Sequence, residues 1–600
     1  MRLLALTLAA AGIAGCDNFA LAFCQTDRDC SGGARCEPTA GICVVGPDAG
    51  APGGGSGNGG SGGGGGVAAA GGGAGGGMIP EPTQLTVLVP TRPARPPSGG
   101  ASYEDTPPAW RRNEALYITV HSTQPLTRAQ LAIGTTVWSQ PAAAASCPVP
   151  CTGHCHCFRV ELWLPPLEGL RGTFTLTASG VDPSGATATA SVPLPVTRFQ
   201  WSRPVIAGHQ IRATPALGAD GTIYVGTSAG AALRTGSLVA LSPTGLERWS
   251  KPLGRIEASP ALSAPGAGQR LYVGAVDALG GRLYAFSPAG ALLGLCALSP
   301  VAGLEASPVV LGSGGAAFYS NGSRALISLL PGASPSCVSK STGSDVPFPG
   351  NLVADGETVY FADVQPRLRR FGLEKEGNHR EWKERTSGGW PGTLPSTWLN
   401  RSLALGSSNQ LVGAGSLATG GGLFQATVGG SLKFDFGFPA APGSVAPQSP
   451  VVATGGTARA GVPTGIAAFT GSSAVVGAGD PIRNAPALGQ GGRLFALAEN
   501  GAVSEWSAAS PPVRRWSSAL DPGPAPAFEA SPTLDCARDP QGAPIPGLPG
   551  VLYAASRGGT LYAVIVDSRG IDATAGWPKY QKDPRNSGNA STGLAEFSCP

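Results

Sequence analysis

The chain has 600 residues, and its composition already excludes several classes of protein. The net charge is only +4 and charged residues make up 13% of the chain, so no strong field of one sign points to nucleic acid or to an anionic lipid surface as a partner. Glycine (92 residues) and proline (56 residues) are abundant, and short apolar runs lie between them. This pattern predicts an all-β fold and leaves room for several domains.

Residues 1–15 have the pattern of an export signal. Arg2 gives a positive start, residues 3–11 are apolar, and small residues lead to Cys16. The apolar stretch is shorter than the ~20 residues that a membrane-spanning helix needs. The tetrapeptide "IAGC" resembles the lipobox of bacterial lipoproteins, and that resemblance implies a lipid on the sulfur of Cys16 and a mature chain that begins there. The alternative is an ordinary secretory signal followed by a chance cysteine.

Cysteine counting agrees with export. The chain has 13 cysteines, and an even number remains once Cys16 is assigned to lipid. Residues 16–45 are too short and polar to bury a core, so two disulfides are predicted to hold them together. The absence of histidine and of a C-x₂-C pair disfavours a zinc site, and the connectivity stays open. The segment resembles the Cys-rich modules that follow the lipobox in some surface lipoproteins, and its cysteines are Cys24, Cys30, Cys36 and Cys43.

Residues 46–79 are almost entirely glycine, alanine and serine. This composition is typical of a flexible linker. A random coil of about 30 residues spans roughly 30 Å, so we expect the linker to act as a tether between the anchor and the rest of the chain.

Residues 80–198 alternate apolar and polar positions in several short runs. In residues 84–90 the apolar set is Leu85, Val87 and Val89, and turn residues separate this run from those that follow. About seven short strands in this length predict a β-sandwich. The end of the segment resembles the last hairpin of an immunoglobulin-like domain. The other strands are expected at 115–121, 158–164, 172–179 and 186–195.

Residues 199–591 contain eight similar units of 36–51 residues, the strongest architectural signal in the sequence. Each unit opens on a run such as "TPALGADGTIYVGT" and continues with one such as "RLYAFSPAG", often followed by tryptophan. Four short strands per unit predict a β-propeller of seven or eight blades, because the 36-residue sixth unit leaves the number open. Residues 197–206 are expected to supply an outer strand that closes the ring.

This repeat resembles that of quinoprotein-type (PQQ-like) β-propellers, which also occurs in BamB-like envelope lipoproteins. Residues 576–591 resemble a segment found beside such propellers, and 592–600 are expected to form a C-terminal tail. Quinone enzymes of this type have a catalytic aspartate, vicinal cysteines and regular docking tryptophans. The sequence has no adjacent cysteines and no regular docking motif, and Asp220, Asp355 and Asp535 have the positions of turn formers. We therefore predict no enzyme activity and no cofactor.

One stretch, "CPVPCTGHCHC", combines thiols and imidazoles at close spacing. Two disulfides are the favoured interpretation in an oxidising compartment, and a zinc or copper site is the alternative. Further disulfides are expected between Cys296 and Cys337 and between Cys536 and Cys599, with free buried thiols as the alternative. The charged segment 367–385 is expected to be a solvated loop or an outer blade face. The residues of the first stretch are Cys147, Cys151, His154, Cys155, His156 and Cys157.

The sequence as a whole predicts an exported, monomeric protein that is lipid-anchored to a bacterial membrane, in the periplasm or on the outer surface. Its expected function is non-catalytic binding of an envelope protein or polysaccharide, with a role in envelope assembly implied by the BamB-like repeat. Two alternatives from other classes are a periplasmic quinone-dependent oxidoreductase and a surface adhesin. Nucleic acid is not expected as a partner.

Overall fold

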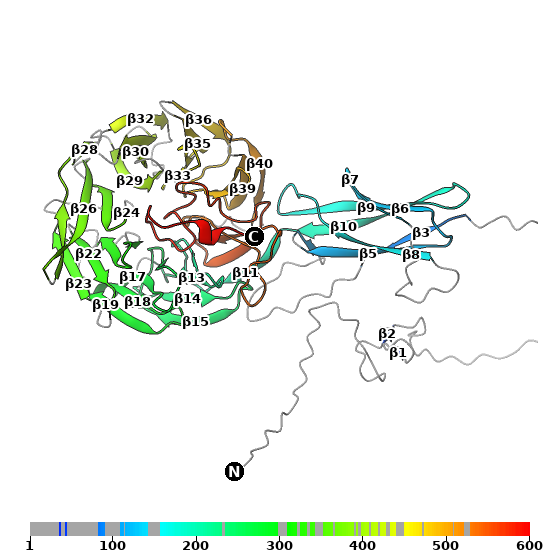
Figure 1. The fold of residues 1–600 in the computed structure, drawn as a ribbon, viewed down its shortest axis with the longest axis horizontal. Coiled ribbons are helices and arrows are strands. Elements are labelled where there is room, and N and C mark those ends of the chain that lie inside the picture. The colour runs from blue at the N-terminus through cyan, green and yellow to red at the C-terminus, as the bar shows by residue number, and fades with distance from the viewer. Residues whose placement is uncertain are drawn as a thin grey trace, which may run out of the picture. The chain divides into compact units, whose positions relative to one another are not determined.

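The computed structural model in Figure 1 divides the chain into two compact units, residues 1–80 and residues 81–600. Regular structure in the described residues is almost all strand, with one 3₁₀ turn, η2 (Ala595–Phe597). No helix among them has the length and apolar character that crossing a membrane requires. The described residues are 35–37, 42–44, 82–89, 109–112, 114–141, 156–230, 234–297, 309–320, 325–332, 336–341, 352–363, 367–377, 379–388, 390, 392–393, 398–406, 410–417, 420–427, 432–439, 449–470, 473–507, 509–520 and 528–600.

The first unit contains one described hairpin. Strand β1 (Arg35–Glu37) pairs antiparallel with β2 (Ile42–Val44), and the register places Cys36 opposite Cys43. Cys16, Cys24 and Cys30 lie outside the described residues, as do the predicted export signal and the glycine-rich linker. Those predictions stay predictions.

The second unit begins with two sheets that share one hydrophobic core. The predicted strands near residues 85, 116, 160, 175 and 190 are all present. The structure also contains three strands that were not predicted individually, at residues 110–111, 128–133 and 136–141. One sheet has the order β3 (Leu85–Leu88), β5 (Ala115–Ser122), β8 (His156–Trp163), and the other has the order β4 (Trp110–Arg111), β10 (Thr187–Thr197), β9 (Arg171–Val181), β6 (Arg128–Ile133), β7 (Thr136–Pro141).

Alternation along the strands explains why these two sheets pack face to face. Along β5 every second side chain is buried, and Leu116, Ile118 and Val120 all point into the shared core. The β9–β10 hairpin turns at Asp182, whose carboxylate accepts hydrogen bonds from the Ser184 and Thr83 hydroxyls at 2.6 Å each. These bonds lower the pKa of Asp182 to about 2.

The described residues from 199 onward form eight sheets, each an antiparallel meander of four main strands. Figure 1 shows the sheets arranged as a ring, so this part of the chain is a β-propeller. In order around the ring the sheets are β11 (Phe199–Pro204), β43 (Thr560–Ile565), β42 (Val551–Ala555), β41 (Thr533–Asp535); β12 (Ala216–Leu217), β13 (Ile223–Gly226), β14 (Ser237–Leu241), β15 (Glu247–Pro252); β16 (Ala261–Leu262), β17 (Leu271–Asp277), β18 (Gly280–Phe286), β19 (Leu292–Ala297); β20 (Val310–Leu311), β21 (Ala317–Ser320), β22 (Ala325–Leu330), β23 (Ser336–Ser341); β24 (Val353–Asp355), β25 (Thr358–Ala362), β26 (Arg367–Glu376), β27 (His379–Glu384), with β28 (Gly392–Thr393) beside β26; β29 (Trp398–Leu405), β30 (Gln410–Leu417), β31 (Gly420–Thr427), β32 (Leu432–Pro439); β33 (Val451–Val452), β34 (Ala458–Val462), β35 (Gly465–Thr470), β36 (Ser473–Ala478); and β37 (Ala487–Gly489), β38 (Arg493–Leu497), β39 (Ala502–Ser507), β40 (Arg514–Ala519).

Strand β11 closes the ring. It precedes the other ring strands in the sequence, yet it pairs antiparallel with β43, with Arg203 opposite Leu561. The predicted closing strand at 197–206 is therefore confirmed. Because β11 becomes the outermost strand of the sheet that also contains β41 to β43, the first and last parts of the ring share one set of backbone hydrogen bonds.

Strands of the ring are buried on both faces. All five residues of β14 are buried, and neighbouring side chains enter different cores. Val239 packs with one cluster, whereas Leu238 packs with the cluster of the next sheet. This is why the repeats read as continuous apolar runs rather than as the alternation seen in β5.

The Ser-Pro or Thr-Pro pair that opens many repeats links neighbouring sheets. The Thr214 amide donates to the Ser259 hydroxyl at 2.9 Å, and the Ser531 amide donates to the Thr214 hydroxyl at 3.0 Å. The Ala485 amide donates in the same way to the Ser531 hydroxyl at 3.0 Å. Each hydroxyl therefore satisfies a buried backbone donor of an adjacent sheet.

Two tryptophans dock against turns of a neighbouring sheet. The indole of Trp201 donates to the Pro243 carbonyl at 2.8 Å, and that of Trp249 donates to the Pro288 carbonyl at 3.0 Å. The Trp201 ring lies so close to Gly245 that a Cβ there would approach it to 2.9 Å, and the φ of 83° at Gly245 also favours glycine. Docking tryptophans are therefore present at these two junctions, and this does not contradict the prediction that no regular docking motif runs through the repeats.

Residues 367–385 are not a loop. They form most of β26 and β27, so the outer-face interpretation holds and the solvated-loop alternative is wrong. Arg369 on β26 pairs with Glu384 on β27 at 2.6 Å, and Arg380 on β27 pairs with Glu357 in the β24–β25 turn at 3.4 Å.

Candidate functional site

The centre of the ring is filled by the chain's own C-terminal part, drawn in red in Figure 1. We call residues 577–590 the axial segment. Its backbone oxygens accept hydrogen bonds from the first strands of six sheets, at 2.7–2.9 Å. The pairs, donor first, are Leu217 with Pro584, Leu262 with Arg585, Leu311 with Ser587, Ala354 with Gly588, Val452 with Trp577 and Leu488 with Pro578.

Side-chain amides of the axial segment reach further carbonyls of the ring. Asn586 donates to the carbonyls of Thr214 and Pro260 at 3.1 and 3.0 Å. Gln581 donates to the Val309 carbonyl at 2.8 Å. The polar residues of this segment are therefore buried because they satisfy acceptors at the ends of the inner strands.

Lys579 is fully buried in the axial segment. Its ammonium group donates to the carbonyls of Tyr580 and Asp583 at 2.7 and 3.1 Å and to the Asn586 side chain at 2.5 Å. These acceptors match the three donors of an ammonium group. Burial nevertheless lowers the pKa of Lys579 to about 7, and the charge of Asp583 opposes that shift.

The backbone of the axial segment is tightly turned. Gln581, Lys582 and Asn586 have φ values of 54°, 71° and 57°, a conformation that costs energy for residues other than glycine. Asp583 supports the turn, because its carboxylate accepts hydrogen bonds from the amide and the hydroxyl of Ser587. The surrounding sheets therefore hold the segment in a conformation that it would not adopt alone.

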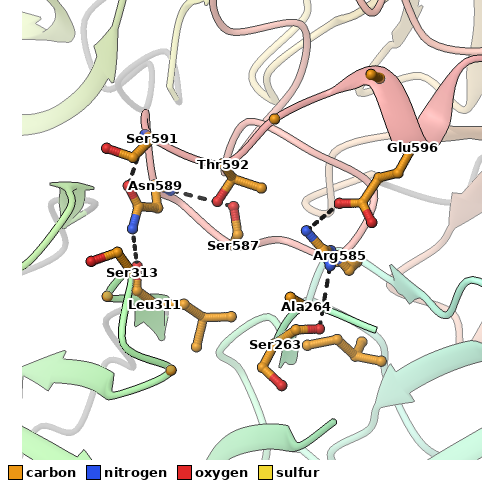
Figure 2. A pocket seen from close by; sticks show the side chains of 15 residues that line it. Ser263, Ala264, Leu311, Ser313, Arg585, Ser587, Asn589, Ser591, Thr592 and Glu596 are labelled. Carbon is orange, nitrogen blue, oxygen red and sulfur yellow. Dashed lines mark hydrogen bonds and ion pairs between the residues drawn. The ribbon is translucent and has the colours of Figure 1, made fainter. Parts of the chain in front are cut away.

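A cavity of about 500 Å³ lies beside the axial segment, where two first strands, β16 and β20, lead into their turns. We call it the axial pocket. Figure 2 shows Asn589 and Ser591 on one side of it and Arg585 with Glu596 on the other. Its lining mixes apolar and polar groups, and the polar side chains include Ser263, Ser313, Arg585, Asn589, Thr592 and Glu596.

Arg585 is the strongest charge in the axial pocket. Its side chain is 3% exposed, and one terminal nitrogen contacts a Glu596 carboxylate oxygen at 2.5 Å. The other terminal nitrogen donates to the Ser263 carbonyl at 3.4 Å. Burial raises the pKa of Glu596, Arg585 opposes this shift, and Asp583 adds to it.

Of the three aspartates that the sequence singles out, Asp220 lies in a turn, Asp355 and Asp535 are the last residues of β24 and β41, and the three are not brought together. Asp220 accepts the Thr222 amide at 3.1 Å and pairs with Arg248 at 2.5 Å. Asp535 pairs with Arg538 at 2.7 Å. Asp355 accepts the Ser591 hydroxyl at 2.5 Å, which places it against the end of the axial segment.

Two disulfides are present in the propeller. Cys296 on β19 is bonded to Cys337 on β23 of the neighbouring sheet, and Cys536 is bonded to Cys599. The second bond ties the C-terminal end to the sheet of β41. It therefore fixes the turn that carries Glu596.

Most of the predicted thiol–imidazole stretch lies outside the described residues, which include His156 and Cys157 from it. Both lie on β8, and Cys157 is disulfide-bonded. The remaining members, Cys147, Cys151, His154 and Cys155, are not described.

Elsewhere among the described residues, ligand atoms of Glu376, His379 and Glu381 lie within 4.8 Å of one another. The two glutamates and the histidine are on the exposed β26–β27 hairpin, and Lys383 pairs with Glu376. Exposed acidic groups of this kind are common on protein surfaces, so the cluster is not taken as a metal site.

The sequence indicates that residues 576–591 resemble a segment found beside PQQ-like propellers, but it does not predict their burial in the ring or the axial pocket. Residues 577–590 contain two lysines, two prolines and two asparagines, a composition typical of an exposed loop. The two large aromatic residues Trp577 and Tyr580 are the signal that could have indicated burial.

Comparison with protein-family models and with curated proteins found no match. Among solved structures, the chain is similar to BamB from Moraxella catarrhalis, with 13% identity, coverage of 55% of this chain and 92% of that one, and a TM-score of 0.34. It is also similar to Sqt1 from Chaetomium thermophilum bound to the N-terminus of the ribosomal protein L10, with 13% identity, coverage of 60% and 98%, and a TM-score of 0.43. For Sqt1 from Saccharomyces cerevisiae the values are 10%, 52% and 97%, and 0.33. Likeness at these identities and scores says nothing about what this chain binds.

Proposed function

We propose that this chain is a non-catalytic lipoprotein of the bacterial cell envelope whose propeller binds a protein or polysaccharide partner. The observation that carries the proposal is the filled ring centre. Because residues 577–590 pair with six inner strands, a large ligand has access only to the rims and outer faces of the ring. Such surfaces suit recognition of a macromolecule better than enclosure of a planar cofactor on the axis.

The proposed organisation follows the chain from its anchor. Cys16 bears the lipid after removal of residues 1–15, a disulfide-held module and a flexible tether follow, and an immunoglobulin-like sandwich precedes a propeller of eight blades. The proposed ranges are 16–45 for the module, 46–79 for the tether, 80–198 for the sandwich, 199–591 for the propeller and 592–600 for the tail.

A site-specific crosslinking experiment in living cells tests the binding function. A photoreactive amino acid at Ser313, which is exposed beside the axial pocket, should form an adduct with a partner. The control position is Leu279, which is 77% exposed in the β17–β18 turn, because successive turns of a meander lie at opposite ends of a sheet.

Anchoring is tested by Cys16→Ala in the same cells. We expect this variant to leave the membrane fraction or to remain unprocessed, and the Ser313 adduct to decrease with it. A correctly cleaved Cys16→Ala protein that still fractionates with membranes would contradict the lipid anchor. Absence of an adduct from both crosslinking positions would contradict the binding function.

A further inference from the structure

We propose that the axial pocket binds a ligand carboxylate, which replaces Glu596 on the guanidinium group of Arg585. This inference rests on the proposed binding function and names the chemistry that one of its sites recognises. The ligand is either a free carboxylic acid or an acidic side chain of a partner peptide.

One hydrogen-bond donor of the Arg585 guanidinium group has no partner among the described residues. The residue is 3% exposed, and its Nε has no hydrogen-bond partner in the described part of the chain. A buried donor without a partner is costly, so nearly all such groups in folded proteins are paired. The Phe597 ring lies 5.2 Å from the guanidinium carbon, which helps hold the group in place.

Glu596 occupies the guanidinium only in part. Its contact is with one terminal nitrogen, at 2.5 Å, whereas a carboxylate commonly bridges two neighbouring donors of an arginine. About a third of the Glu596 side chain is exposed, so it can turn toward solvent without crossing a packed core. Nε is itself buried in the folded chain, so in the proposed complex a ligand carboxylate bridges Nε and the neighbouring terminal nitrogen after Glu596 has turned away.

The rest of the pocket agrees with a small polar group. The cavity of about 500 Å³ is within the range of small-molecule sites, and the Ser263, Ser313 and Thr592 side chains contribute hydroxyls to its lining. None of its lining residues, all of which are described, is aromatic. A saccharide would therefore find no ring to stack on there, which favours a carboxylate as the recognised group.

Isothermal titration of the purified chain with three probes tests this inference. The probes are glutarate, a blocked tri-glutamate peptide, and glutaramide, which has the shape of glutarate but no charge. We expect glutarate, the peptide or both to bind with one site per chain, and glutaramide to bind at least tenfold more weakly. Binding of glutarate alone identifies a free acid as the source, and binding of the peptide alone identifies a partner protein.

Two variants of pocket residues test whether the ligand carboxylate binds to the guanidinium group of Arg585. Glu596→Gln removes the competing carboxylate and should tighten binding by about threefold to tenfold. Arg585→Lys keeps the charge but loses the planar pair of donors, and should weaken binding at least tenfold. The matched control is Arg248→Gln, because its Asp220 pair lies at a turn of the ring outside the pocket lining.

The outcomes separate this inference from the proposed function. No binding of glutarate or peptide, equal binding of glutaramide, or affinities that Glu596→Gln leaves unchanged would overturn the carboxylate site. If a crosslinked partner is still found at Ser313 in that case, the binding function stands and only the carboxylate chemistry fails. Thermal melting of each variant shows whether the ring is intact, and Glu596→Gln keeps the test decisive if Arg585→Lys does not fold.

Discussion

The two-sheet region and the ring bury their strands in different ways. In the two-sheet region a strand such as β5 has one buried face, so Ile118 is enclosed while its neighbour Thr119 is only half-buried. In the ring a strand such as β14 has two buried faces, and Leu238 and Val239 enter different cores. One-sided burial lets a sheet be stable with a single partner, whereas two-sided burial makes every sheet of the ring depend on both neighbours.

The ring also differs from the two-sheet region in where its innermost strands find hydrogen-bond partners. Its first strands converge on an axis, and their backbone groups need partners there. The axial segment supplies those partners from the far end of the chain, as when the Leu217 amide donates to the Pro584 carbonyl at 2.8 Å. The ring is therefore built around a polar centre, and the two-sheet region around an apolar one.

Of the predicted changes, removal of residues 576–600 should lower the stability of the ring most and leave the two-sheet region folded. The amides of six inner strands lose their acceptors and Trp577, which is fully buried, is lost, so we expect the ring to lose more than about 6 kcal/mol of stability or to fail to fold. Differential scanning calorimetry of the full and shortened chains should show the ring transition displaced or absent while the two-sheet transition remains. A ring transition at its normal temperature would contradict the structural role of the axial segment.

The second prediction concerns the pH dependence of the ring. Lys579 has a pKa of about 7 in the folded chain, against 10.5 for an ordinary lysine. Between these values the unfolded chain binds more protons, so stability should rise with pH from about 7 toward 10, by up to ~5 kcal/mol. Below pH 7 both states hold the proton and the contribution is flat at its lowest value.

Melting temperatures of the natural chain and Lys579→Met, measured from pH 6 to 9.5, isolate this contribution. The rise with pH should be larger in the natural chain than in the variant, where the lowered pKa of Lys582 leaves a smaller rise, and Lys251→Met on β15 serves as the control. The range stops below pH 10 because burial raises the pKa of Tyr580, so its ionisation in the unfolded chain would lower stability there. Parallel profiles for the natural chain and Lys579→Met would show that Lys579 stays charged in the folded chain.

The smallest predicted effects test two-sided burial directly. In the ring, Leu238→Ala and Val239→Ala should each cost ~2–4 kcal/mol, because both side chains are fully buried. In the two-sheet region Ile118→Ala should cost a similar amount, but Thr119→Ala only about 0.5 kcal/mol. Chemical denaturation of the four variants measures these differences. A small effect at either ring position would show that one face of β14 is not part of a packed core.

Much of the fold was predictable because it depends on local pattern. The alternation in β5 and the recurring runs similar to "TPALGADGTIYVGT" are visible in the sequence, since burial on one face or on two leaves different periodicities. The short unit that starts at Ser449 still forms four strands, β33 to β36, because its connecting turns are short. The β6–β7 hairpin was missed although Ala129, Leu131 and Ile133 alternate, because Ala129 gives a weak apolar signal.

The candidate site was not predictable in the same way. Asn586 and Lys579 are polar residues in a turn-rich segment, and such residues are normally solvated. Their burial depends on carbonyls that are distant in sequence, as in the 372 positions between Asn586 and Thr214. No periodicity in the sequence indicates such a contact, so the burial of Arg585 and the position of its pocket can be found only from the folded structure.

The ring cannot be completed before the axial segment has been synthesised. A ribosome adds about 5–20 residues per second, so roughly 20–70 s separate the synthesis of Thr214 from that of Asn586, whose side chain its carbonyl accepts. Strand β11 waits almost as long for β43. Until the last residues emerge, the inner strands present unpaired edges, which is the state in which β-proteins aggregate. Six inner strands therefore lack their axial partners until the last 25 residues are available to pair with them.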